Sequence, residues 1–287
     1  SPTGPNRPCS DCSLFKILMH MQETSDTSID NNSGLTPSVI APHEGLPILI
    51  IYVLFVLKWG PKWMQNRPPY DIKKLLILHN IIQVVACGYI FYEVISSVNY
   101  ALYFYSIFSP VDYSNNPKSL KVAGFVYHYY LVKYLDLLDT VFFVLRKKFN
   151  QVSFLHYIFY FNVFTIFPSP FLGGHGTFVG LVNSFVHVVM YGYYLLTTLR
   201  PATKKSVWWK KHLTQLQIVQ LTMICFHMSL LLVTPNCKFP WWIAVLMIPN
   251  DFFLLCLFVD FYIKTYIKKQ NKIRLIASHR AGAMRAA

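Results

Sequence analysis

Apolar residues are gathered into seven long stretches, and short polar or basic segments separate one stretch from the next. A helix that crosses the hydrocarbon core of a bilayer needs about 20 predominantly apolar residues, and roughly 17–25 are usual. Five stretches reach this length, whereas the first and the fourth are short. The pattern predicts an all-α integral membrane protein with seven transmembrane helices, near Leu46–Leu57, Leu75–Val98, Val122–Leu145, Val152–Phe167, Phe178–Leu199, His212–Val233 and Trp241–Ile263.

The chain before the first stretch has a different composition. Residues 1–40 are rich in Pro, Ser, Thr and Asn without a sustained hydrophobic period, so we predict a disordered segment. It has no apolar core followed by a cleavage site, which argues against a signal peptide. The sequon Asn31-Asn32-Ser33 is usable only where this end is lumenal. The predicted organisation is a lumenal segment 1–40, a seven-helix membrane domain 41–274 and a cytosolic tail 275–287.

Basic residues cluster on alternate sides of the predicted spans. The chain carries 26 Lys and Arg against 12 Asp and Glu, and most of these cations follow the first, third, fifth and seventh stretches. Cytosolic loops of membrane proteins carry such an excess, so we expect a lumenal N-terminus and a cytosolic C-terminus. With 54% hydrophobic and only 13% charged residues, the net charge of +14 indicates membrane topology, and no nucleic-acid partner is expected.

Charged side chains lie inside the third stretch, where they are costly. Lys133 and Asp136 are three positions apart, as are Asp136 and Asp139, and Thr140 follows directly. On a helix these residues share one face. They are either a self-compensating ion cluster that fixes helix packing or part of a functional site.

Uncharged polar residues form stripes on the fifth and sixth stretches. Spacings of four and three residues place one set on the side of a helix that should face the bundle interior: Asn183, His187, Tyr191 and Tyr194. Steps of three align a second set, for which hydrogen bonds between helices and contact with a substrate are equal alternatives: Thr214, Gln217 and Gln220. Three further histidines within the spans are lone and are interpreted as packing residues: His79, His128 and His227.

The cysteines point to no specific chemistry. Cys9 and Cys12 have the spacing of a redox motif but lack the strand and helix that such a motif needs around it. Cys87, Cys225 and Cys256 lie inside apolar stretches, where a free buried thiol is common.

Several of these segments resemble the very-long-chain fatty-acid elongases (ELO type), membrane enzymes that condense malonyl-CoA with an acyl-CoA. Residues 133–148, KYLDLLDTVFFVLRKK, are similar to the family's K-x-x-E/D-x-x-D-T signature with its basic tail. Residues 183–194, NSFVHVVMYGYY, resemble its second long motif, and Thr214, Gln217 and Gln220 match its T-x-x-Q-x-x-Q element. The similar segments follow the family's order between Leu46 and Arg274, and the loop GGHG at 173–176 is arthropod-like.

The resemblance implies that six of the seven helices form an inverted barrel around a narrow acyl tunnel whose CoA end opens to the cytosol. It implies a 3-oxoacyl-CoA synthase of the endoplasmic reticulum membrane that uses acyl-CoA and malonyl-CoA, with no metal or other cofactor. Other copies of the chain and other enzymes of the elongation cycle are candidate partners. The implied catalytic residues are His187, His156, Lys133, Asp136 and Asp139. The implied substrate-binding residues are Asn183, Tyr191, Tyr194, Thr214, Gln217 and Gln220.

The chain departs from the family at the H-x-x-H-H box of the fourth stretch. The segment here reads HYIFY, so His156 is kept while Phe159 and Tyr160 replace the paired histidines. The resemblance implies that an imidazole of this box takes the acyl group, which neutral imidazole can do as a nucleophile. Either His156 or His187 substitutes, or the chain is a pseudo-elongase that binds acyl-CoA or regulates active elongases. A sequencing or gene-model error is a third alternative.

A second departure concerns the lumenal side. Family members carry a cysteine two residues before the proline of the P-V-D-Y-S element, bridged to one in the sixth loop, whereas Phe108 stands there. We therefore expect Cys237 to form no bridge between these loops. The ten histidines are scattered rather than paired in boxes, so a di-iron site is rejected. A seven-helix receptor shares the topology, but the short loops, the ordered family motifs and the charged third stretch argue against it.

Overall fold

The computed structural model of the protein describes residues 42–96, 117–148, 175–234 and 241–268, and every element within these ranges is helical. The first rod consists of α2 (Pro42–Leu54), the π-helical turn η1 (Phe55–Trp59) and α3 (Gly60–Met64). The other long helices are α4 (Lys73–Ser96), α6 (Pro117–Leu145), α8 (His175–Leu199), α9 (Val207–Val233) and α10 (Trp241–Tyr262). A 3-10 turn precedes α9 and a π-helical turn extends α10: η4 (Pro201–Lys205) and η5 (Ile263–Lys268).

Five helical segments are long and apolar enough to cross a membrane: Pro47–Met64, Lys73–Ser96, Gly176–Leu199, Val207–Val233 and Ile243–Lys268. They confirm the predicted all-helical membrane class. α6 has 29 residues but carries Lys133, Asp136 and Asp139 in its centre and is not among these five. The predicted fourth stretch, Val152–Phe167, lies outside the described residues, so the number of seven helices stays a prediction.

The first span is longer than its apolar pattern predicts. The pattern ends near Leu57, yet the helix continues to Met64 and gives a span of 18 residues. The π turn accommodates the irregular sequence, because the N–H of Gly60 donates to the carbonyl of Phe55. Pro61 lies in the first turn of α3, where its missing N–H costs little.

α3 and the end of α6 are joined at one end of the bundle. A Cβ atom on Gly60 would lie 2.8 Å from Cγ1 of Val144, so only glycine permits this approach. α6 ends with Lys147 in the left-handed region, at φ 53°, and with the backbone hydrogen bonds of a Schellman motif. Nζ of Lys147 donates to the carbonyl of Gln65, 3.0 Å away.

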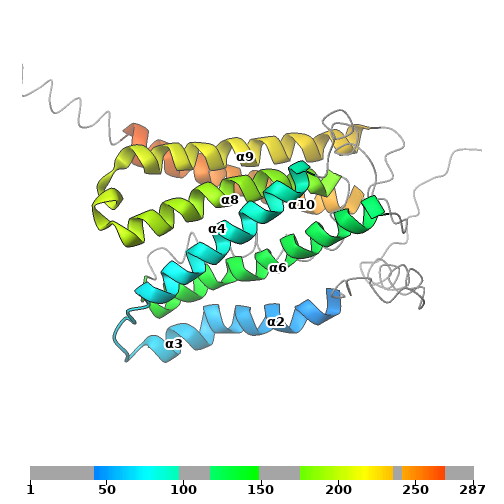
Figure 1. Cartoon of the computed structure of the whole chain (residues 1–287). Helices are drawn as coiled ribbons and strands as arrows, with labels where there is room; N and C mark the ends of the chain where they lie inside the picture. Colours follow the sequence, from blue (N-terminus) through cyan, green and yellow to red (C-terminus); the bar gives the residue numbers. More distant parts are fainter. Residues whose placement is uncertain (1–41, 97–116, 149–174, 235–240, 269–287) are drawn as a thin grey trace, which may run out of the picture.

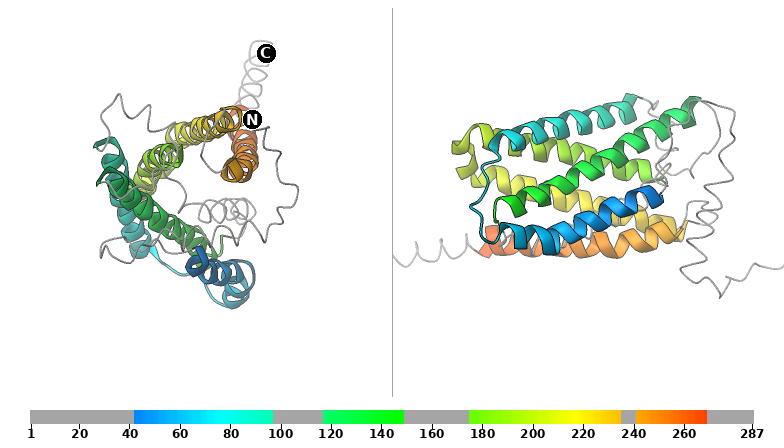
Figure 2. Two further views of the ribbon diagram at one scale, coloured as in Figure 1. Left: turned by 90° about the vertical axis from the view of Figure 1, so that its right-hand side faces the viewer. Right: turned by 90° about the horizontal axis from the view of Figure 1, so that it is seen from below.

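The long helices lie side by side in a curved row (Figures 1 and 2). Neighbours along the row are, in order, α2 with α3, α6, α4, α8, α9 and α10, and the end-on view in Figure 2 shows the row bending round on itself. The connections from α3 to α4 and from α8 to α9 lie at the same end as the last residues of α6 and η5 (Figure 1). The described basic clusters therefore gather at one end: Lys62, Arg67, Lys73, Arg146, Lys147, Arg200, Lys210 and Lys268.

Apolar side chains fill the interior and also cover the outer faces. The larger core cluster draws residues from α4, α6, α8, α9 and α10, and a second cluster lies where the first rod meets α6. On the outside, Val85, Phe226 and Val233 are 66%, 66% and 75% exposed. An apolar outer surface on helices of this length suits lipid rather than water, so the protein is a multi-pass membrane protein.

Candidate functional site

Polar and charged residues of α4, α6 and α8 meet inside the bundle. At their centre Lys133 of α6 is 2% exposed, and its Nζ donates to Oδ2 of Asp136 at 2.8 Å and to Oδ1 of Asn183 at 2.6 Å. The hydroxyl of Tyr129 donates to the same Asn183 oxygen at 3.1 Å, and the Tyr129 ring lies 4.9 Å from Nζ. The ammonium group of Lys133 is therefore held by a carboxylate, an amide and an aromatic face.

Asp136 connects all three helices through one carboxylate. Its Oδ1 accepts a hydrogen bond from Nε2 of Gln83 in α4 at 2.9 Å and lies 3.2 Å from the Tyr191 hydroxyl of α8. Nδ1 of His187, also on α8, is 3.6 Å from that oxygen and has no hydrogen-bond partner among the described residues. Since Lys133 holds the other oxygen, the carboxylate sets the positions of an amide, a phenol and an imidazole.

Asp139 lies one helical turn further along α6 and repeats this pattern. Tyr191 donates to its Oδ2 at 2.6 Å, and Nε2 of His79 in α4 is 3.2 Å from its Oδ1. The His79 ring stands edge-on to the rings of Phe142 and Tyr191, at 5.1 and 5.8 Å between centroids. A continuous chain of polar contacts therefore links the two imidazoles. It runs from His79 through Asp139, Tyr191 and Asp136 to His187.

The structure brings together six of the residues that the sequence singled out, the polar cluster: Lys133, Asp136, Asp139, Asn183, His187 and Tyr191. Tyr194 is less enclosed than the predicted stripe requires, since it is 39% exposed, although its ring is 6.0 Å from that of Tyr191. His156, Phe159 and Tyr160 lie outside the described residues, as do Phe108 and Cys237.

The three polar residues of α9 have separate surroundings. The Thr214 hydroxyl donates to the carbonyl of Lys210 in its own helix at 2.9 Å. Gln217 reaches α8, where its Nε2 is 3.4 Å from Sδ of Met190. Gln220 is buried at 6% exposure. Gln217 therefore contacts the helix that carries His187.

Two members of the site were missed by the sequence reasoning. His79 was interpreted as a lone packing residue; it does pack against the rings of Phe142 and Tyr191, but its Nε2 also lies 3.2 Å from Asp139. Gln83 was not considered, although it holds Asp136. The signal was present in α4, where His79, Gln83 and Cys87 are spaced by four residues in an otherwise apolar span.

The other two histidines also pack against aromatic rings. His227 stacks on Phe178 at 4.4 Å, and His128 meets Tyr89 edge-on at 5.6 Å. Within the described ranges no three His, Cys, Asp or Glu side chains are arranged to ligate a metal ion.

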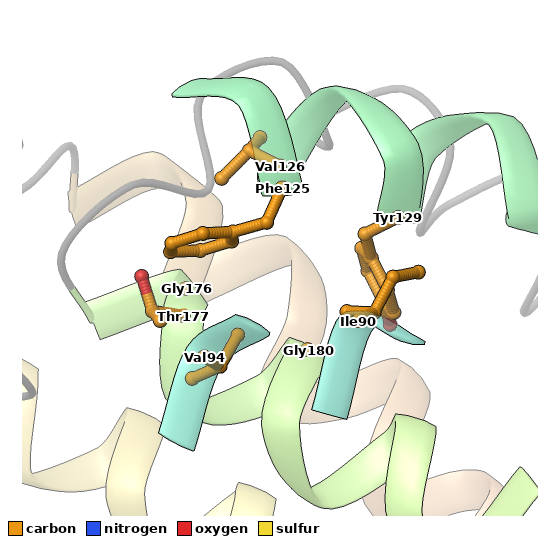
Figure 3. Close-up of a pocket in the computed structure, with 8 residues that line it drawn as sticks. All are labelled: Ile90, Val94, Phe125, Val126, Tyr129, Gly176, Thr177 and Gly180. Atoms are coloured by element: carbon orange, nitrogen blue, oxygen red, sulfur yellow. The ribbon is translucent and has the colours of Figure 1, made fainter. Parts of the chain in front are cut away.

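An apolar recess opens beside the polar cluster, between the ends of α4, α6 and α8 that are remote from the basic residues (Figure 3). Tyr129 belongs to both, since its ring lines the recess while its hydroxyl contacts Asn183. The remaining lining residues are apolar or small: Ile90, Val94, Phe125, Val126, Gly176, Thr177 and Gly180. A polar centre is thus followed directly by an apolar region.

These features define a class: a multi-pass helical membrane protein with a charged, imidazole-bearing centre buried between three spans. Residues 41–274 match the model of the ELO family, described as the GNS1/SUR4 family. This chain belongs to that family, which confirms the resemblance carried by its motifs.

Named relatives agree with this assignment. The chain is 38% identical over 277 residues to a very long chain fatty acid elongase of Aedes aegypti, which covers 93% of this chain and 75% of that protein. It is 41% identical over 234 residues to very long chain fatty acid elongase 4 of Homo sapiens, with 80% and 73% covered. It is 34% identical over 255 residues to very long chain fatty acid elongase 7 of Drosophila melanogaster, with 88% and 77% covered.

Proposed function

We propose that this protein is a very-long-chain 3-oxoacyl-CoA synthase, which condenses malonyl-CoA with a long-chain acyl-CoA and extends it by two carbons. The observation that carries the proposal is the polar cluster, in which His187 lies beside a buried Lys133–Asp136 pair in a chain of the ELO family. Buried charges in membrane spans are costly and usually mark a functional site. The names of the relatives support the same reaction class.

The chemistry needs a nucleophile that can carry an acyl group. A nitrogen of neutral His187 attacks the thioester carbon, the carbon–sulfur bond breaks, and the departing CoA thiolate takes the proton that the imidazole gives up. Malonyl-CoA then loses CO2, and the electron pair of the broken bond forms the new carbon–carbon bond to the acyl carbon. The acyl–nitrogen bond breaks, and the imidazole takes up a proton.

The other cluster residues hold the reacting groups in place. Lys133, Asp136 and Asp139 orient the thioester end, because Lys133 donates to Asp136 and Tyr191 donates to Asp139, and these hydrogen bonds hold the side chains in place. The proposed polar lining of the tunnel consists of Asn183, Tyr191, Tyr194, Thr214, Gln217 and Gln220.

The proposed architecture is that of the family, with seven helices of which six form an inverted barrel around the acyl tunnel. The curved row of helices supports this arrangement. We place the basic end at the cytosol and the N-terminus in the lumen of the endoplasmic reticulum. Lys and Arg at the open end would attract the phosphates of CoA. No metal or other cofactor takes part in this proposal.

A second candidate is a protein that binds acyl-CoA without condensing it. The observation in its favour is the pair Phe159 and Tyr160, which replaces two imidazoles of the family's histidine box. Both candidates share the fold and the binding site, so they differ only in whether a malonyl-dependent product forms.

The test is elongation by microsomes of elongase-deficient yeast that express the protein, with labelled malonyl-CoA and a panel of acyl-CoAs. We expect longer acyl products from the unmodified protein and a loss of about 100-fold or more in His187→Ala, the range of a lost acid–base or nucleophilic group. His128→Gln, which changes an exposed histidine on α6, is the matched control and should keep full activity.

A double variant, Phe159→His with Tyr160→His, separates the two candidates. If only this variant makes product, the framework is that of an elongase and the natural chain is a binding or regulatory protein. If neither is active although both are folded, the condensing function is refuted.

A further inference from the structure

The connection between α3 and α4 holds a cation against two aromatic rings at the basic end of the bundle (Figure 1). The guanidinium carbon of Arg67 lies 4.3 Å from the centre of the Trp63 ring, and Nη1 of Arg67 donates to the Tyr70 hydroxyl at 3.2 Å. The Trp63 and Tyr70 rings are 5.8 Å apart between centroids. We name these three residues the arginine clamp. All three side chains are exposed, so the guanidinium is held in position and still open to a ligand.

The backbone of the clamp is anchored to the end of α6. The N–H of Tyr70 donates to the carbonyl of Leu145 at 3.1 Å, and Nζ of Lys147 donates to the carbonyl of Gln65 at 3.0 Å. An excess of Lys and Arg is enough to set the orientation of a membrane protein, and it needs no fixed geometry. Topology therefore explains the basic residues of this end but not an arginine that is stacked and anchored.

The charge around the clamp favours an anionic ligand. A guanidinium has five N–H donors; one of those of Arg67 is bonded to Tyr70, and no carboxylate of the described ranges pairs with this residue. The only acid between Lys58 and Lys74 is Asp71, which accepts the backbone N–H of Lys73 at 3.2 Å. The planar guanidinium matches two oxygens of one phosphate group. The free donors of Arg67 therefore suit a phosphate.

The clamp lies at the depth of lipid headgroups. The first candidate span, Pro47–Met64, ends one residue after Trp63, and Arg67 follows three residues beyond that end. Trp and Tyr are enriched at this level of a bilayer, where one side of the ring meets acyl chains and the other meets water. The guanidinium is therefore level with the phosphates of the surrounding leaflet.

An exposed stripe of the first rod leads along the span to the clamp. Ile51, Trp59 and Trp63 each come directly before a residue of the buried side of the rod, so they share one side of it. Those buried residues are Tyr52, Gly60 and Met64. The three stripe residues are 60%, 51% and 44% exposed. An aliphatic side chain, two indoles and a guanidinium thus follow one another in the order of acyl chain, glycerol and phosphate in a phospholipid.

We propose that the arginine clamp binds the phosphate headgroup of an anionic phospholipid in the leaflet at the basic end of the bundle, with the acyl chains of that lipid along the stripe. This inference does not depend on the proposed function. CoA is another source of phosphate, but the clamp continues the exposed side of the rod, whereas the polar cluster lies between α4, α6 and α8. The lipid is therefore the ligand that the surface fits.

The first test measures the affinity for lipids of different charge. The full chain in detergent is titrated with phosphatidylserine or with phosphatidylcholine of the same acyl chains, and bound lipid is counted by native mass spectrometry. One cation near an anionic headgroup contributes roughly fivefold in affinity. We expect Arg67→Gln to lower the preference for phosphatidylserine by about fivefold. Lys264→Gln, which removes the same charge from an exposed lysine of η5, is the matched control and should keep the preference. An unchanged preference in Arg67→Gln, or equal losses in both variants, overturns the proposal.

Arg67→Lys separates the clamp from charge alone. Lysine keeps the charge but has neither the planar fork nor the same stacking on Trp63, so we expect this variant to lose at least half of the preference. Trp63→Leu, which removes the stacked ring, should do the same. Full preference in both variants means that any cation suffices and contradicts the clamp. Should Arg67→Gln fail to fold, these two variants decide the affinity test.

A last experiment locates the lipid and needs no variant. Photoactivatable phosphatidylserine is cross-linked to the unmodified protein in phosphatidylcholine nanodiscs, and the labelled peptide is identified by mass spectrometry. We expect the label within residues 59–72, and an excess of free CoA should not reduce it. A label elsewhere refutes the site. Displacement by CoA means that the clamp binds the phosphates of CoA rather than a lipid, which also overturns the proposal.

Discussion

The interior between α4, α6 and α8 differs sharply from the interface between α9 and α10. In the first region Lys133, Asp136 and Tyr191 are all buried, and Lys133 and Tyr191 both donate hydrogen bonds to the Asp136 carboxylate. In the second, apolar residues of both helices pack together, and Asp251 of α10 lies among them. It is 0% exposed, and neither of its carboxylate oxygens has a hydrogen-bond partner in the part of the chain that the structure describes.

Burial of a charged side chain is therefore not by itself evidence of a functional site. Both regions bury carboxylates, but only the first arranges a cation, two imidazoles and a phenol around them. Polar groups that pair with one another keep fixed positions inside a membrane span. A lone buried carboxylate has no such partner and lowers the free energy of unfolding. The same kind of substitution should therefore have opposite effects in the two regions.

The largest effect is expected when the polar region loses its cation. Lys133→Met removes the cation that pairs with Asp136 and one of the two donors to Oδ1 of Asn183, and removing one partner of a buried pair costs about 3–5 kcal/mol. Unfolding in mixed detergent micelles, followed by circular dichroism, measures the change. The double variant Lys133→Met with Asp136→Leu should recover most of the loss, and full stability of the single variant would mean that the pair does not hold the region together.

A smaller loss is expected when the phenol between the two carboxylates loses its hydroxyl. Tyr191→Phe removes the 2.6 Å hydrogen bond to Asp139 and the 3.2 Å contact with Asp136. Hydrogen bonds to charged groups contribute about 1.5–3 kcal/mol, and the same unfolding assay should show a loss of this size. Tyr89→Phe, an exposed tyrosine of α4, is the control and should change stability little.

The smallest effect has the opposite sign. Asp251→Leu replaces an unpartnered buried carboxylate by an apolar side chain in an apolar seam, so we expect a gain of about 1–2 kcal/mol. Asp260→Ala is the matched control, since Asp260 is 57% exposed and pairs only with the exposed Lys264, and such surface pairs contribute about 0–1 kcal/mol. A destabilised Asp251→Leu would mean that this carboxylate stabilises the packing of α10.

The positions of the helices were predictable from the sequence because they follow from the lengths of the apolar stretches. The predicted stretch Phe178–Leu199 differs from α8 only at its start, His175. The predicted end of the first stretch was wrong. Lys58, Gly60 and Pro61 interrupt the apolar pattern, but the helix continues through a π turn at this point. A local pattern does not reveal such a turn.

The candidate site was predictable within a helix but not between helices. The three-residue spacing of Lys133 and Asp136 placed them on one face, and they are 2.8 Å apart. The contact of His79 with Asp139 depends on which face of α4 packs against α6 and α8, and one sequence does not contain that information. His79 therefore looked like an isolated residue.

The charged centre of α6 also has a consequence for the biogenesis of the protein. The ribosome makes α4 before α6 and α6 before α8, so Lys133, Asp136 and Asp139 reach the membrane after His79 and Gln83 but before Asn183 and Tyr191. Each charge near the middle of a helix opposes insertion by roughly 2.5–3.5 kcal/mol. α6 should therefore enter the bilayer beside α4 and remain dependent on the translocation machinery until α8 delivers Asn183 and Tyr191. Substitutions in this centre would then lower the amount of protein that escapes quality control before they alter any rate.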